Sequence, residues 1–237
     1  MHPNIFIGDI AIPTWYAMLI LGAVSATALA IYARPKDFML GRPELLFVAI
    51  ILIAAGLVGG RALFNILHGG RASGGFAYFG ALILSIITLW AYTKLRKIRF
   101  LALADYALPF LMLSQVFVRI GCLMAGCCYG KATNLMCGVI FKTGDKLARH
   151  PTQVYEAILL LTIYVISRII YGKKRTLAGH TFFTALMMYG AGRFFVEFLR
   201  TDSFVIFLNL TLAQYSCLAL ALAALIGRMS IKSTIPS

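Results

Sequence analysis

Seven apolar runs, each long enough to form a membrane helix, cover most of this 237-residue chain. A helix needs about 20 mostly apolar residues to cross the hydrocarbon core of a bilayer, and it satisfies its own backbone polar groups there. The runs lie near 15–32, 45–67, 76–93, 101–125, 152–171, 177–198 and 205–226. We therefore expect an all-α fold: a polytopic membrane bundle of about seven transmembrane helices.

Composition excludes an ordinary soluble protein. Hydrophobic residues make up 61% of the chain and charged residues 13%, whereas soluble domains have roughly 45 to 50% and about 25%. The seven runs leave no room for a separate soluble domain. We expect residues 1–237 to form a single integral membrane domain, with 126–150 as a periplasmic loop.

The distribution of Lys and Arg predicts the orientation of the bundle. Cations gather at 34–42, 94–99, 173–175 and 228–232, on alternate connections, and such connections face the cytoplasm. This places the N-terminus outside and the C-terminus in the cytoplasm. The net charge of +14 is spread over these turns rather than over one face, so it favours anionic membrane lipids over nucleic acid as a partner.

Three arginines lie inside or at the margin of apolar runs: Arg61, Arg119 and Arg193. An arginine at the bilayer centre costs roughly 2.5 to 3.5 kcal/mol on insertion scales, so such a residue usually faces a protected interior. The pattern predicts an anion-binding pocket inside the bundle. Arg119 could instead reach the outer headgroups from a helix end, and Arg61 could sit at the interface. Arg168, close to a helix end, can reach the interface too.

Helical spacing places further polar residues beside Arg193. Tyr189, Glu197 and Arg200 recur with it at intervals of three and four, so the four side chains share one helix face. Glu197 could orient Arg193 toward a ligand, or the pair could only neutralise itself within the bundle. Both interpretations are compatible with one structure.

Three longer motifs carry a family resemblance. They read VRIGCLMAGCCYG at 118–130, RHPTQVYE at 149–156 and MYGAGRFFVEFLR at 188–200. Shorter segments follow in the same order as in the family: TWYAM, GLVGGR, SGGFAYFGAL, ADYALP and LTLAQYS. Together they resemble the prolipoprotein diacylglyceryl transferase family over nearly the whole chain. That family has seven spans and an external N-terminus.

The resemblance implies a reaction, its substrates and a location. The family transfers the diacylglyceryl group of phosphatidylglycerol to the thiol of a lipobox cysteine in a prolipoprotein signal peptide, and it releases glycerol phosphate. We therefore expect a transferase of lipoprotein biosynthesis that needs no cofactor, in the bacterial cytoplasmic (inner) membrane. Guanidinium groups suit this chemistry because they bind phosphate oxygens in pairs.

The resemblance also assigns roles to residues. Arg119, Arg193 and Glu197 would be catalytic. The expected substrate-binding residues are Tyr16, Arg61, Gly121, Tyr189, Arg200, His150 and Tyr155. Tyr16 could equally belong to an interfacial aromatic belt, and His150 could shape the mouth of the pocket.

The position expected to carry a catalytic base departs from the family pattern. A histidine proposed as the base for the incoming thiol is replaced here by Phe79, which cannot accept a proton. An electropositive site could lower the thiol pKa without a base. Two other classes stay open: a non-catalytic or altered-acceptor relative that binds phospholipid or signal peptide, and an anion or solute transporter.

The chain has five cysteines: Cys122, Cys127, Cys128, Cys137 and Cys217. Cys122 and Cys127 replace an asparagine and a glutamate of the common family motif. A Cys128–Cys137 disulfide is possible in an oxidising compartment. The spacing C-x4-C-C-x8-C matches no zinc template, and only His150 lies nearby, so the sequence predicts no metal.

Overall fold

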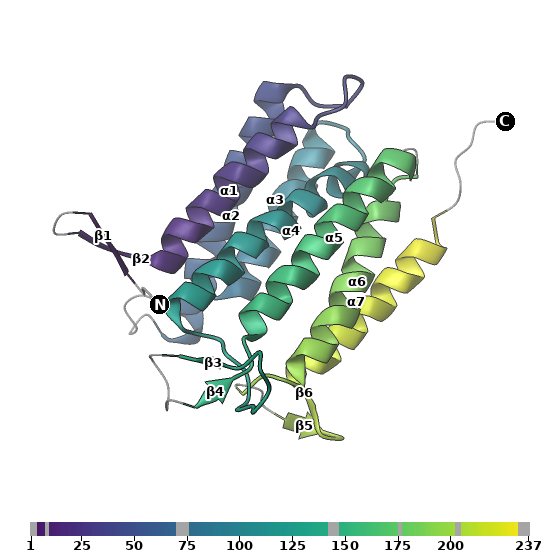
Figure 1. Ribbon diagram of the computed structural model, residues 1–237. Coiled ribbons are helices and arrows are strands. Elements are labelled where there is room, and N and C mark those ends of the chain that lie inside the picture. Colours follow the sequence, from purple (N-terminus) through teal and green to yellow (C-terminus); the bar gives the residue numbers. More distant parts are fainter. Residues whose placement is uncertain are drawn as a thin grey trace. The chain divides into compact units, whose positions relative to one another are not determined.

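The computed structural model describes residues 4–7, 10–69, 76–141, 147–174, 177–201 and 205–231. These residues form seven α-helices and three antiparallel two-stranded sheets (Figure 1). The helices are α1 (Thr14–Tyr32), α2 (Arg42–Leu67), α3 (Tyr78–Leu95), α4 (Phe100–Ala125), α5 (Thr152–Lys174), α6 (His180–Glu197) and α7 (Leu212–Met229). The strands are β1 (Asn4–Ile7), β2 (Ile10–Pro13), β3 (Val139–Ile140), β4 (Ala148–Arg149), β5 (Val205–Phe207) and β6 (Leu210–Thr211). The expected helical membrane fold is confirmed.

Six helices in the described part of the chain are long and apolar enough to cross a membrane. The exception is α6, because its 18 residues include His180, Arg193 and Glu197. The orientation of the bundle stays a prediction. Part of the sequence evidence lies outside the described residues: 142–146 of the long loop, 73–75 ahead of α3, and the cations Arg175 and Lys232.

One predicted helix boundary is wrong. The sequence predicts a helix from residue 205, whereas α7 begins at Leu212 and β5 and β6 form a hairpin before it. Leu208 and Asn209 form its turn with positive φ angles of 49° and 56°. Thr211 then caps α7, since its hydroxyl accepts a hydrogen bond from the Gln214 amide at 3.2 Å. Apolar composition predicts burial, but it does not separate a hairpin from a helix.

The chain divides into two compact units, residues 27–103 and residues 1–26 with 104–237. In the smaller unit α2 and α3 touch through Gly59 and Gly80. A Cβ at Gly59 would lie 2.3 Å from the carbonyl oxygen of Gly80, so only glycine permits this approach. The single membrane domain that the sequence predicts stays a prediction.

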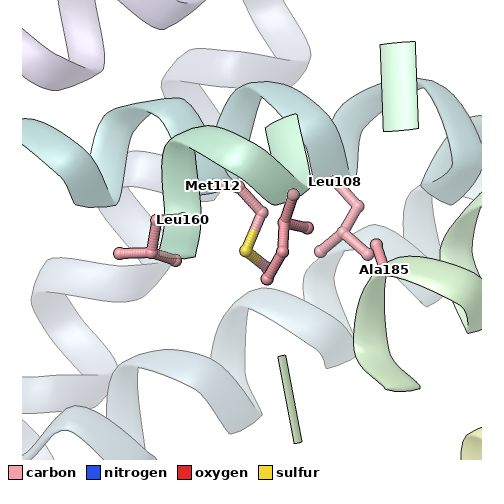
Figure 2. Packing of buried hydrophobic residues seen from close by; sticks show 5 residues of the cluster. Leu108, Met112, Leu160 and Ala185 are labelled. Atoms are coloured by element: carbon pink, nitrogen blue, oxygen red, sulfur yellow. The ribbon is translucent and has the colours of Figure 1, made fainter. Parts of the chain in front are cut away.

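The larger unit is built around α4, α5, α6 and α7 (Figure 1). Its apolar cluster comprises Leu108 and Met112 of α4, Leu160 and Ile163 of α5, and Ala185 of α6 (Figure 2). Spacings of four and three residues put each pair on one helix face. The cluster fixes the three helices that carry the candidate site.

A buried carboxylate also positions α6. Both oxygens of Asp105, on α4, accept hydrogen bonds at 2.6 Å, one from the Gly179 amide and one from the Phe182 amide. These are backbone donors at a helix start that have no partner within the helix. Asp105 therefore fixes the end of α6 that is remote from Arg193. The β3–β4 and β5–β6 hairpins lie together at the other end of these helices (Figure 1).

Candidate active site

A network of five charged side chains forms near the hairpin end of the larger unit. Glu156 of α5 is its centre, because Arg119 of α4, Arg193 of α6 and Arg200, which follows α6, all contact it. The nitrogen–oxygen distances are 2.7 Å to Arg119, 3.8 Å to Arg193 and 3.5 Å to Arg200. Glu197 is a second acceptor, at 2.6 Å from Arg193 and 3.9 Å from Arg200.

The network is buried and carries a net positive charge. The side chains of Glu156 and Glu197 are 2% and 4% exposed, and that of Arg119 is the most accessible at 23%. Three guanidinium groups share two carboxylates, which leaves one positive charge. Nε of Arg119 is buried, and no hydrogen-bond acceptor for it lies among the described residues. A buried site with a surplus of guanidinium donors is suited to bind an anion.

An apolar groove of about 290 Å³ adjoins Arg119, between α4 and α5. Arg119 and Gln153 are its polar members. Its other lining residues are apolar: Val116, Ile120, Leu123, Val154, Ala157, Ile158 and Leu161. The side-chain carbonyl of Gln153 is buried, with no donor among the described residues. The accessible wall of the groove is therefore apolar, and the groove lies beside the charged network.

The segment after α4 is tied to the same end of the bundle. The hydroxyl of Thr152 donates to the Cys128 carbonyl at 2.7 Å, and the side-chain amide of Gln153 donates to the Cys127 carbonyl. A Cβ on Gly130 would lie 2.4 Å from the carbonyl oxygen of Leu199, so glycine is needed where this segment meets the end of α6. These contacts hold the GCCYG motif beside the charged network.

The segment brings three thiols together. The sulfur atoms of Cys122, Cys127 and Cys128 lie within 4.8 Å of one another. All five cysteines are free thiols, so the suggested Cys128–Cys137 disulfide is absent. Hydrogen bonds from Cys122 and Cys127 lower the pKa of the Cys128 thiol, and the positive charges of Arg200 and Arg119 act in the same direction, while burial opposes them.

The predicted substrate-binding residues of the larger unit fall into several places. Arg200 is in the charged network. Gly121 is a packing position, since a Cβ there would lie 2.9 Å from Cβ of Met18 on α1. Tyr189 packs against the apolar cluster, and His150 Nδ1 lies 3.2 Å from the hydroxyl of Tyr155. Contacts of these residues with a substrate stay predictions.

Three other predicted residues lie outside the charged network. Tyr16, on α1, is 42% exposed and stacks on Trp15. Arg61, on α2, and Phe79, on α3, belong to the smaller unit and are exposed. Their roles in binding stay predictions.

Comparison of the sequence with known proteins identifies the family of this chain. A sequence model of the prolipoprotein diacylglyceryl transferase family matches residues 4–229. The chain belongs to this family. The phosphatidylglycerol–prolipoprotein diacylglyceryl transferase of Clostridium tetani is 34% identical to it over 202 residues, which are 78% of this chain and 80% of the relative. The Clostridium perfringens protein with that name and the number 2 is 34% identical, covering 78% and 77%. The Dehalococcoides mccartyi protein is 30% identical, covering 83% and 80%.

One residue of the site was missing from the sequence prediction. Glu156 is the last residue of RHPTQVYE, one of the three motifs that carry the family resemblance, and the sequence predicted no role for it in a charged network. The signal was present, because Glu156 is the only acid in the apolar run 152–171 and a buried acid needs a cationic partner. The partners were not apparent, since Arg119, Arg193 and Arg200 lie 37 or more residues away.

Proposed function

We propose that this protein transfers the diacylglyceryl group of phosphatidylglycerol to the thiol of a lipobox cysteine in a prolipoprotein, with release of glycerol phosphate. The reaction takes place in the bacterial cytoplasmic membrane, at its outer leaflet. The names of the Clostridium and Dehalococcoides relatives support the substrates and the reaction. The observation that carries the proposal is the buried network with its surplus guanidinium charge beside an apolar groove.

Arg119, Arg193 and Arg200 act on the leaving group. The acceptor thiolate attacks the glycerol carbon that bears the phosphate, the carbon–sulfur bond forms, and the carbon–oxygen bond breaks. The electron pair of that bond goes to the phosphate oxygen of the departing glycerol phosphate. Guanidinium donors that are fixed before the reaction stabilise this growing charge most strongly where water is excluded.

Glu156 and Glu197 position the arginines. Each carboxylate contacts at least two guanidinium groups, so neither arginine of α4 or α6 can rotate without losing an ion pair. The hydroxyl of Thr211 also donates to Glu197 at 3.3 Å, which ties α6 to the start of α7. The phosphate thus meets donors whose directions are already set, which is the condition for an electrostatic contribution to kcat.

The groove suits one acyl chain of the lipid. Its wall is apolar, and Arg119 is one of the residues that line it. With an acyl chain in the groove, the phosphodiester would lie next to Arg119, and a turn of this side chain would expose its buried Nε to a phosphate oxygen. Affinity for the chain and recognition of the phosphate therefore come from neighbouring atoms.

The test uses the full-length protein in detergent with phosphatidylglycerol and a lipobox peptide. Release of glycerol phosphate, together with a gain of one diacylglyceryl group in the mass of the peptide, is the expected result. A peptide with serine in place of the lipobox cysteine is the control and should give neither product. Lipid binding without release would instead identify a non-catalytic relative, and uptake of solute into protein-containing liposomes would identify a transporter.

A further inference from the structure

The cysteine trio, which we define as Cys122, Cys127 and Cys128, has no part in the charged network. Its members come from the last turn of α4 and the segment that follows it. We propose that the trio binds one Zn²⁺ through three thiolates and leaves a fourth coordination position open. The site would lie beside Arg119 and Arg200, at the end of the groove that Gln153 lines.

The distances between the sulfur atoms fit a tetrahedral zinc site. Zn–S bonds of about 2.3 Å set sulfur–sulfur separations of about 3.8 Å in a tetrahedron. The sulfur atoms of Cys127 and Cys128 are 3.8 Å apart, and all three sulfur atoms lie within 4.8 Å of one another. Small side-chain rotations would therefore complete the site.

The backbone holds the trio in this arrangement. Gly126 has φ of 72° and Cys128 has φ of 62°, and these left-handed residues turn the chain back toward Cys122. For a residue other than glycine, this conformation costs on the order of 1 to 3 kcal/mol and persists only where surrounding contacts maintain it. The hydrogen bonds from Thr152 and Gln153 to the two cysteine carbonyls supply those contacts.

Charge and accessibility also suit a metal with an open position. Three thiolates and Zn²⁺ carry a net charge of −1, and the guanidinium groups of Arg119 and Arg200 lie within electrostatic range of Cys128. Cys127 is exposed, so water or a substrate thiol can reach the site. The spacing C-x4-C lies within the range of two to four intervening residues found in zinc sites, while the adjacent third cysteine is unusual. The sequence argument against a metal rested on that spacing.

The open position would take the acceptor thiol, an assignment that rests on the proposed function. The thiol would displace a zinc-bound hydroxide, which leaves as water after taking the thiol proton. The zinc-held thiolate then uses its electron pair to attack the glycerol carbon, and glycerol phosphate departs. Metal coordination deprotonates a thiol directly, so no base is required at the position of Phe79.

The first test measures metal rather than activity. The full-length protein, purified under reducing conditions without chelators, is analysed for bound zinc by mass spectrometry, and cobalt is then exchanged into the site. One zinc per chain, and thiolate-to-cobalt charge-transfer absorption, are expected. Reduced wild-type protein that binds neither metal overturns the site.

Serine variants locate the ligands. Cys122→Ser, Cys127→Ser and Cys128→Ser should each lower zinc affinity by at least about tenfold. Cys137→Ser and Cys217→Ser are the matched controls and should retain zinc with unchanged affinity. Circular dichroism and thermal melting of each variant identify any that fail to fold. Equal zinc binding by all five folded variants would overturn the assignment.

The role in thiol activation has a separate readout. If zinc is bound but the wild-type protein releases no glycerol phosphate, the proposed function fails while the metal site stands. If glycerol phosphate is released at the same rate by wild-type protein with and without zinc, the proposed function stands and the role of zinc fails. Zinc removal is expected to slow transfer at least about 100-fold, with activity restored when zinc is added back.

Discussion

The larger unit contains partly buried arginines in two different surroundings. Arg168, on α5, lies over three aromatic rings, at 4.8 Å from the ring centre of Phe110, 5.8 Å from Tyr106 and 5.7 Å from Tyr171. Arg119 and Arg193, at the hairpin end, are instead held by Glu156 and Glu197. We expected Arg168 only to reach the membrane interface; its guanidinium is retained by an aromatic cluster inside the protein.

These two kinds of surroundings suit different roles: aromatic rings suit an arginine that stabilises the fold, and carboxylates suit arginines that bind a ligand. Aromatic rings attract a cation through their faces but do not fix the direction of its hydrogen bonds. Carboxylates fix that direction, and the five side chains of the charged network together carry a net positive charge. The Arg168 cluster therefore has a structural role, whereas the charged network has the electrostatics of a binding site. The predictions below test this division.

Removal of a network arginine should have the largest effect. Arg119→Ala or Arg193→Ala removes donors that face the leaving phosphate, and we expect transfer to fall by about 10²–10³-fold or more, chiefly in kcat. Glycerol phosphate release by purified, folded variants measures it. Arg119→Lys and Arg193→Lys keep the charge but lose the paired donors, and they should recover only a small part of the rate. Full activity in both alanine variants would contradict the proposed action of these arginines on the leaving group.

Loss of the shared carboxylate should reduce stability. Glu156→Gln leaves three arginines with one carboxylate, and breaking a buried pair in this way costs about 3 to 5 kcal/mol. A lowered melting temperature in detergent is the expected result. Glu44→Gln is the matched control, because the Glu44–Arg96 pair is exposed and such pairs contribute at most about 1 kcal/mol. Equal losses of melting temperature in the two variants would mean that the buried Glu156 pairs stabilise the protein no more than the exposed Glu44–Arg96 pair.

The helices and the pairing of Arg193 with Glu197 illustrate what the sequence could predict. Apolar run length identified all seven helices, because hydrocarbon thickness and backbone hydrogen bonding leave few alternatives. The start of α7 was wrong, since the β5–β6 hairpin is as apolar as a helix. Arg193 and Glu197 could be paired from the sequence because helical spacing alone brings them together.

Contacts between residues far apart in the sequence could not be predicted from apolar runs or helical spacing. Glu156 meets Arg119 only because the apolar cluster fixes α4 against α5, and no local pattern encodes this distance. Cys122, Cys127 and Cys128 meet because Gly126 and Cys128 adopt left-handed conformations. A spacing rule that assumes ordinary backbone does not predict such a turn, so the closeness of the three thiols was not apparent from the sequence.

Glu197 should have an intermediate effect. Glu197→Gln keeps the shape of the side chain but removes the charge that fixes Arg193, while Glu156 still contacts the same guanidinium at 3.8 Å. We expect kcat to fall about tenfold, with little change in KM for phosphatidylglycerol, because the arginine stays present but less directed. Steady-state kinetics of glycerol phosphate release measures both constants. A change confined to KM would contradict the positioning role.

The smallest effect is expected at Arg168. It tests whether the arginine in aromatic surroundings is dispensable for transfer. Arg168→Met replaces the guanidinium with an apolar side chain that can still pack on Phe110 and Tyr171, so the loss is limited to the cation–ring attraction, about 1 kcal/mol. Transfer should stay within about twofold of wild type, and the melting temperature should fall slightly. Phe110→Leu weakens the same cluster and should give a similar small shift. If Arg168→Met instead abolished transfer in a folded protein, aromatic surroundings could not be taken as the mark of a structural arginine in this bundle.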